Sequence, residues 1–138
     1  MVVSEESVRN RMKLMIESDD IGHLYNINDF RECGPYSAIR TVLVDFCKSK
    51  VLERVFRGIY VKPGTNKRRE SYLPDDITLA KEIDRKNGSI ATPKGKTLDY
   101  VNGIISEKPK VLEFYSTGSG RTVKLSSGVM VKYLFRSI

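Results

Sequence analysis

Residues 36–63 of the chain read YSAIRTVLVDFCKSKVLERVFRGIYVKP, in which a helical pattern passes directly into a hairpin pattern. The first part has apolar residues at intervals of three and four, as on the buried side of a helix: Ile39, Val42, Leu43 and Phe46. In the second part, two β-rich runs are joined through Arg57-Gly58, and glycine readily takes the positive φ of a tight turn. The sequence therefore predicts a helix over residues 36–49, followed by a hairpin.

Two shorter helices are expected before this one. Apolar residues at helical spacing predict a first helix that ends near Ser18. Its buried positions would be Val8, Met12, Met15 and Ile16. A brief second helix through Phe30, capped by Asn28 or Asp29, ends at Gly34-Pro35.

Three short helices followed by a basic hairpin predict a winged helix-turn-helix over residues 1–63. The helix over residues 36–49 is then the recognition helix, and the hairpin is the wing, with Arg54 and Arg57 on or beside it. The helix face opposite the apolar stripe is small, polar and cationic, which is the composition that a helix in the major groove needs. Its members are Ser37, Arg40, Thr41, Val44 and Lys48.

The second half is expected to be a small domain over residues 76–138, after a basic connector over residues 64–75. A helix with Ile77, Ala80 and Ile83 on its buried stripe begins this domain. Strand patterns follow over residues 110–116, 122–125 and 129–135. Arg121 and Lys124 are expected on one strand face, as solvated charges or as an extension of a basic surface. The predicted fold class is α+β, a winged helix-turn-helix followed by a small helix-plus-antiparallel-β domain that ends in a three-strand meander.

Charge supports a polyanionic partner. The 138 residues include 24 Lys and Arg against 17 Asp and Glu, a formal net charge of +7. The densest stretch of one sign runs from Arg54 to Arg69 and contains no acid. Its six cations are Arg54, Arg57, Lys62, Lys67, Arg68 and Arg69. Such a run is either a solvated basic loop or a contact for a polyanion such as nucleic acid.

Catalysis and metal binding find little support in the sequence. Cys33, Cys47 and His23 are the only cysteines and the only histidine, too few for a zinc site or a Cys-His pair at close spacing. We therefore expect two buried or half-buried thiols, no cofactor, no metal and no enzymatic activity. No apolar run reaches the roughly 18 residues of a membrane span, so a cytoplasmic protein without a membrane partner is expected.

The hairpin sequence carries a resemblance. Residues 52–63, LERVFRGIYVKP, resemble the wing signature L-x-R-V-x-R-G-x-Y of the AbiEi-type antitoxins and their short relatives. The second half is similar to the short transcriptional-regulator branch of that family: an Ile-Ala-Lys-rich helix, then Pro93-x-Gly95, Gly103, and GSGRTVKL at residues 118–125. The resemblance covers about residues 20–135.

This resemblance implies a DNA-binding repressor, the antitoxin of a type IV toxin–antitoxin system that binds inverted repeats in its own operon. The implied partners are double-stranded DNA and a cognate nucleotidyltransferase-like toxin, contacted directly or only functionally. The residues expected at the DNA are Tyr36, Ser37, Arg40, Thr41, Lys48, Arg54, Arg57, Lys67, Arg68 and Arg69. The alternative is a protein-interaction module that neutralises or scaffolds a toxin without specific DNA binding. RNA binding ranks lower, because no aromatic pair has the spacing of a stacking platform.

Overall fold

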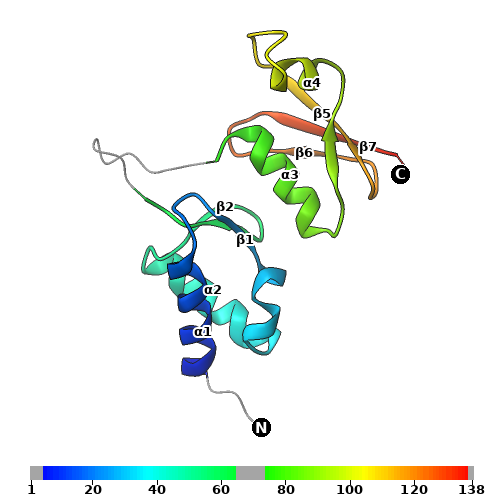
Figure 1. Ribbon diagram of the computed structural model, residues 1–138. Coiled ribbons are helices and arrows are strands. Elements are labelled where there is room, and N and C mark those ends of the chain that lie inside the picture. Colours follow the sequence, from blue (N-terminus) through cyan, green and yellow to red (C-terminus); the bar gives the residue numbers. More distant parts are fainter. Residues whose placement is uncertain (1–4, 65–73, 137–138) are drawn as a thin grey trace. The chain divides into compact units, whose positions relative to one another are not determined.

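Helices and short strands alternate along the chain, and the strands form two separate sheets (Figure 1). This arrangement confirms the predicted α+β class. The computed structural model describes residues 5–64 and 74–136. The chain divides into two compact units between Pro74 and Asp75. Most of the predicted connector, residues 64–75, lies outside the described residues.

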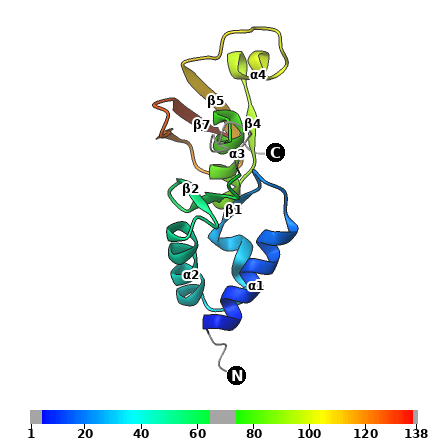
Figure 2. The ribbon, with the colours of Figure 1, turned by 90° about the vertical axis from the view of Figure 1, so that its left-hand side faces the viewer.

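The first unit contains the helices α1 (Glu5–Ser18), η1 (Ile27–Cys33) and α2 (Tyr36–Lys48) (Figures 1 and 2). The predicted stripes are buried in α1 and α2, except that Met15 is only partly buried. The brief second helix is a 3-10 helix, and its predicted caps are wrong. Asn26 caps it instead. Its side chain accepts a hydrogen bond from the amide of Asn28, and its own amide donates a hydrogen bond to the Asp29 carboxylate.

The sheet of this unit has the antiparallel order β1-β3-β2, with β1 (Leu24–Asn26), β2 (Glu53–Phe56) and β3 (Ile59–Val61). The predicted hairpin is present as β2 and β3, and Gly58 in its turn has a φ of 76°. Phe30, Leu43 and Phe46 lie in a core formed mainly by α1, η1 and α2. This core fixes the side of α2 that faces inward and leaves the opposite side in solvent.

The end of α2 is held by a residue that the sequence did not single out. Lys50 has a φ of 64°, the left-handed conformation that glycine usually supplies after a helix. The amide of Lys50 bonds to the carbonyl of Cys47, and the amide of Val51 bonds to the carbonyl of Phe46 at 2.9 Å. These two bonds turn the chain from the helix into the hairpin.

The second unit contains α3 (Asp76–Lys86), β4 (Ala91–Pro93), α4 (Gly95–Val101), β5 (Val111–Ser116), β6 (Arg121–Lys124) and β7 (Met130–Phe135). Its sheet has the order β4-β5-β7-β6, in which β5 and β7 run parallel. The predicted antiparallel three-strand meander is therefore wrong. The physical reason is burial: β7, with buried Val131 and Tyr133, takes the interior, while the short and polar β6 takes the edge.

Helix α3 packs against one face of this sheet, which we call the inner face. Tyr133 donates a hydrogen bond to the carbonyl of Ala80 at 2.6 Å, and Leu112 and Phe114 are buried on the same face. We call the opposite side of the sheet the outer face. Ile77, which was expected on the buried stripe of α3, is only half-buried, and Leu79 is buried in addition to Ala80 and Ile83.

Candidate nucleic-acid interface

The solvent side of α2 carries the predicted polar face. Ser37, Thr41 and Lys48 are exposed, and so is half of the Val44 side chain. The Thr41 hydroxyl donates a hydrogen bond to the carbonyl of Ser37 at 3.0 Å, so its oxygen keeps accepting capacity toward solvent. These side chains form one accessible row, because positions four and three apart share a helix face.

Arg40 lies at the flank of this row, on the side of the hairpin. Tyr60 of β3 relates this part of α2 to the hairpin. Burial raises the pKa of the Tyr60 phenol, and among the nearby groups Arg54 and Arg40 both lower it by their positive charges. Arg54 of β2 is the register partner of Tyr60 on β3, which places the two side chains on one face of the hairpin. Tyr60 is the final residue of the wing signature in residues 52–63, but it was not among the residues expected at the DNA.

The hairpin also reaches the carboxyl-terminal part of α2. Burial raises the pKa of the Cys47 thiol, and the positive charge of Arg54 partly opposes this effect. Burial likewise raises the pKa of Cys33, which is buried. A thiol with a raised pKa is a poor nucleophile at neutral pH, so both cysteines behave as the expected buried or half-buried thiols. Arg54 thus lies near both Cys47 and Tyr60, where hairpin and helix meet.

The one acid of α2 lies at the edge of this surface and is paired with a cation of α1. Asp45, the only acidic residue of the helix, accepts a hydrogen bond from Arg9 of α1 at 2.7 Å. Asp45 is four residues from Thr41 and three from Lys48, so this pair borders the exposed row. The charge of Asp45 is compensated by Arg9, and the other charged side chains of α2, Arg40 and Lys48, are cations.

The remaining predicted residues fall into different classes. Tyr36 is exposed at the first position of α2, and Arg54 and Arg57 are exposed on the hairpin. Lys62 belongs to the basic run but points inward, since its ammonium group donates to the carbonyls of Ile16 and Asp19 at 2.9 and 2.6 Å at the end of α1. Lys67, Arg68 and Arg69 lie outside the described residues.

A buried polar network in the second unit was missed by the sequence reasoning. The Asp84 side chain is 0% exposed and accepts hydrogen bonds from Ser116 at 2.7 Å and from Arg121 at 3.1 Å. The guanidinium group of Arg121 also lies 4.2 Å from the centre of the Tyr133 ring. Arg121 is therefore a structural cation and not a solvated one. The expectation that it shares a face with Lys124 is wrong, because residues three apart on a strand point to opposite faces.

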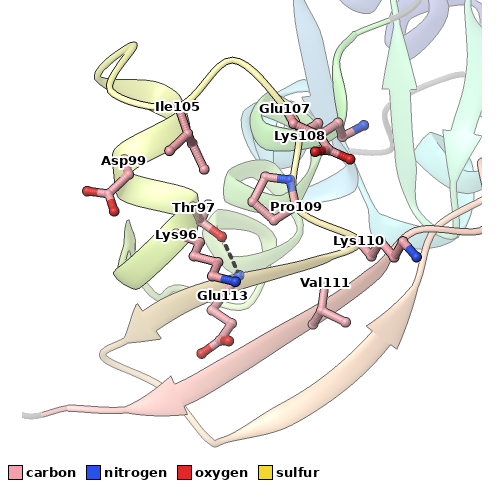
Figure 3. Close-up of a pocket in the computed structure, with 10 residues that line it drawn as sticks. All are labelled: Lys96, Thr97, Asp99, Ile105, Glu107, Lys108, Pro109, Lys110, Val111 and Glu113. Atoms are coloured by element: carbon pink, nitrogen blue, oxygen red, sulfur yellow. Dashed lines mark hydrogen bonds between the residues drawn. The ribbon is translucent and has the colours of Figure 1, made fainter.

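The second unit also has an open hollow of about 620 Å³ between α4 and the start of β5 (Figure 3). The Thr97 hydroxyl accepts a hydrogen bond from the amide of Glu113 at its base. Its charged lining includes Lys96 and Lys110 together with Asp99 and Glu107. Charges of both signs alternate around the hollow, so it does not select an ion of either sign.

Metal sites and membrane spans are the two other kinds of site to consider in the part of the chain that the structure describes. Within residues 5–64 and 74–136, no three His, Cys, Asp or Glu side chains are grouped as ligands for a metal ion. Among the same residues, no helix is both long enough and apolar enough to cross a membrane. The strongest candidate for a functional site is therefore the surface that α2 and the hairpin form around Tyr60.

Comparison with known proteins adds a family. No curated protein and no solved structure matches the chain. A family profile, described as a family of unknown function, matches residues 11–133 and so spans both units. On this match, the chain belongs to the DUF6088 family.

Proposed function

We propose that the chain is a DNA-binding transcriptional regulator whose first unit is a winged helix-turn-helix. In this proposal η1 and α2 are the two helices of the helix-turn-helix, and the β2–β3 hairpin is the wing. The observation that carries the proposal is that the exposed polar and cationic row of α2 and the exposed Arg54 and Arg57 of the hairpin belong to one compact unit. Winged domains use such a pair of elements to read bases and to hold the backbone.

The surface of α2 has the features that insertion into a major groove requires. Its solvent side has short polar side chains and a cation, and the neighbouring Asp45 carboxylate is paired with Arg9. No side chain caps the amino end of the helix, so the first amide groups of α2 are available for a phosphate. In this arrangement Ser37, Arg40 and Thr41 lie near base edges, and Lys48 lies near a phosphate.

The wing would contact the sugar–phosphate backbone or the minor groove through Arg54 and Arg57, which are both exposed. Lys67, Arg68 and Arg69 follow the wing in the sequence and are assigned to the same role. Lys62 is removed from this role, because its ammonium group is bound to carbonyls at the end of α1.

The regulator is further proposed to be the antitoxin of a type IV toxin–antitoxin operon that represses its own synthesis by binding inverted repeats. This part rests on the resemblance of residues 52–63 and of the second half to AbiEi-type proteins. A gene for a nucleotidyltransferase-like protein beside the gene for this chain would support it. A toxin whose activity is unchanged by co-expression of the chain would contradict it.

Two substitutions separate base reading from backbone contact. With fluorescein-labelled duplex from the region upstream of the gene, Arg40→Ala should weaken binding by about 1–3 kcal/mol and relax the preference over a scrambled duplex. Arg54→Ala should weaken binding to both duplexes alike and lower the slope of log affinity against log salt by about one unit. Lys81→Ala, at an exposed position of α3, is the control. Equal effects of all three substitutions would refute the assignment.

A second candidate function is a protein-interaction module that neutralises or scaffolds a toxin without specific DNA binding. It is favoured by apolar side chains that are exposed on and after α4: Leu98 at 40%, Val101 at 45% and Ile104 at 70%. Exposed apolar groups near one another are typical of protein contacts. Co-purification with the product of the neighbouring gene, unaffected by charge reversal at Arg54 and Arg57, would favour this function over DNA binding.

A further inference from the structure

The outer face of the second sheet is more exposed to solvent than the inner face, against which α3 packs. Along β5, Leu112 and Phe114 are buried on the inner face, whereas Val111 is exposed and Tyr115 is half-buried on the outer face. The strand registers place these residues on the outer face: Thr92, Val111, Glu113, Tyr115, Thr122, Lys124, Met130, Lys132 and Leu134. The outer face is therefore a mixed apolar and cationic surface.

Two more cations join this face through Tyr115. The Lys94 ammonium lies 5.4 Å from the centre of the Tyr115 ring, and the Arg136 guanidinium lies 4.6 Å from it. Lys94 also forms an ion pair of 3.0 Å with Glu113, which is the one acid on the outer face among the described residues. The acid is thus neutralised within the face.

The cations of the outer face differ from those on the other side of the sheet. There, Arg121 is paired with Asp84, Arg85 with Glu82, and Lys108 with Asp76. On the outer face Lys124 and Lys132 are exposed and have no ion pair within the described residues, and Arg136 has only its contact with the Tyr115 ring. Three cations without an ion pair in the described part of the chain thus lie together on the outer face, in addition to single exposed lysines such as Lys81 elsewhere in the unit.

The arrangement of these cations suits a row of phosphates. Lys132 is on β7 and Arg136 directly follows its end, and four residues of extended chain span about 13 Å. Lys124 is on the adjacent strand β6, which lies about 5 Å to the side. Tyr115 does not offer a stacking platform for unpaired bases, because its ring is already covered by Lys94 and Arg136. Charge without stacking fits the backbone of a duplex better than a single strand.

We propose that the outer face, through Lys124, Lys132 and Arg136, is a second DNA-binding surface that contacts phosphates of duplex DNA. This inference rests on the proposed function of the first unit and extends it, since one chain then holds DNA by two surfaces. The proposed contact is independent of base sequence, because the three cations are assigned to phosphates, which are the same at every base pair. Once the first unit is bound to DNA, the outer face is held near the same duplex at a high effective concentration. Even a weak contact with phosphates then raises the overall affinity.

The test measures the salt dependence of DNA binding by the full chain. The labelled upstream duplex is titrated at several salt concentrations between about 50 and 200 mM. Lys132→Gln should lower the slope of log affinity against log salt by about 0.9, and Lys124→Gln/Lys132→Gln should lower it by about 1.8. Lys81→Gln, which removes one exposed charge from α3 on the other side of the sheet, should leave the slope unchanged. The loss should be equal for the upstream and the scrambled duplex.

The outcomes distinguish the two proposals. If the unsubstituted chain binds neither duplex, the proposed function itself has failed. If the unsubstituted chain binds and Arg40→Ala weakens it, but the double variant behaves like Lys81→Gln, then only the second surface is refuted. If the double variant loses affinity for a single-stranded oligonucleotide and not for the duplex, the partner of the outer face is not duplex DNA, and the proposal is overturned.

Discussion

Arg121→Met should strongly destabilise the second unit, because it leaves the Asp84 carboxylate buried without its cation. Methionine preserves the apolar stem that packs over Tyr133 and removes only the guanidinium group. The lost contact is an ion pair of 3.1 Å to a carboxylate that is 0% exposed. Removing one partner of a buried pair costs about 3–5 kcal/mol. We expect about 3 kcal/mol, since Ser116 still donates to Asp84 and the Arg121 side chain is itself 26% exposed.

That loss is large for a unit of this size, whose total stability is about 3–10 kcal/mol. Urea unfolding followed by two-dimensional NMR measures it, because amide signals of each unit report on that unit alone. Signals of the second unit should disappear at lower urea in Arg121→Met, while those of the first unit keep their midpoint. Lys81→Met is the control, an exposed cation on α3, and should change the stability by less than about 0.5 kcal/mol.

A second substitution tests the physical cause. Asp84→Asn/Arg121→Met removes the buried charge together with its partner and keeps an oxygen for the Ser116 hydroxyl. It should be more stable than Arg121→Met alone, because no unpaired charge remains in the interior. The reasoning is refuted if Arg121→Met costs less than about 1 kcal/mol, or if the double variant is no more stable than the single one.

Three further outcomes follow from the first unit. Lys50→Gly should raise its stability by up to about 1 kcal/mol in thermal unfolding, because Lys50 has a φ of 64°; an equal or lower midpoint would contradict this. In a pH titration of the tyrosine signals, Arg54→Ala should raise the already raised pKa of Tyr60, because a nearby positive charge favours the phenolate; an unchanged or lower pKa would show that the two side chains are apart. Gly34→Ala should cost about 1–3 kcal/mol, because the added carbon would lie 2.5 Å from a methyl group of buried Val8. Val8→Ala should recover part of that loss, and no recovery would exclude this clash.

The stability of the second unit should also fall in alkali. Burial is the largest effect on the pKa of Tyr133 and raises it above its ordinary value of 10.0. The positive charge of Arg121 lowers this pKa by less, and the negative charge of Asp84 raises it further. The unfolded chain therefore ionises this phenol at a lower pH than the folded chain. The contribution to stability is complete below pH 10 and is lost as the pH rises above it. Tyr133→Phe should show a weaker decline in the same pH range, and an equal decline would assign the effect to other groups.

Local patterns in the sequence were sufficient for the helices and the hairpin. The apolar stripe of α2 and Gly58 in the turn each act within a few residues, so the sequence alone predicts them. The same holds for α1, whose buried positions follow helical spacing. The predicted polar row on α2 is also correct in its exposure, since a buried stripe fixes which side of the helix remains in solvent.

Features that depend on distant partners were not predictable in this way. The parallel pairing of β5 with β7 joins strands that are not consecutive, and nothing in either strand marks its neighbour. Arg121 looks like any strand cation until the fold brings Asp84 from α3 beside it. Lys62 likewise belongs to a basic run in the sequence, and only the fold shows that its charge is used at the end of α1.

The central claim is that DNA binds to the surface formed by α2 and the β2–β3 hairpin. It is tested most directly by an NMR titration of the chain with the upstream duplex at low salt. We expect the amide signals of Ser37, Arg40 and Arg54 to shift or broaden, while those of Lys13 and Glu17 on the exposed side of α1 remain in place. The absence of any change on adding the duplex, or changes confined to α1, would contradict this claim.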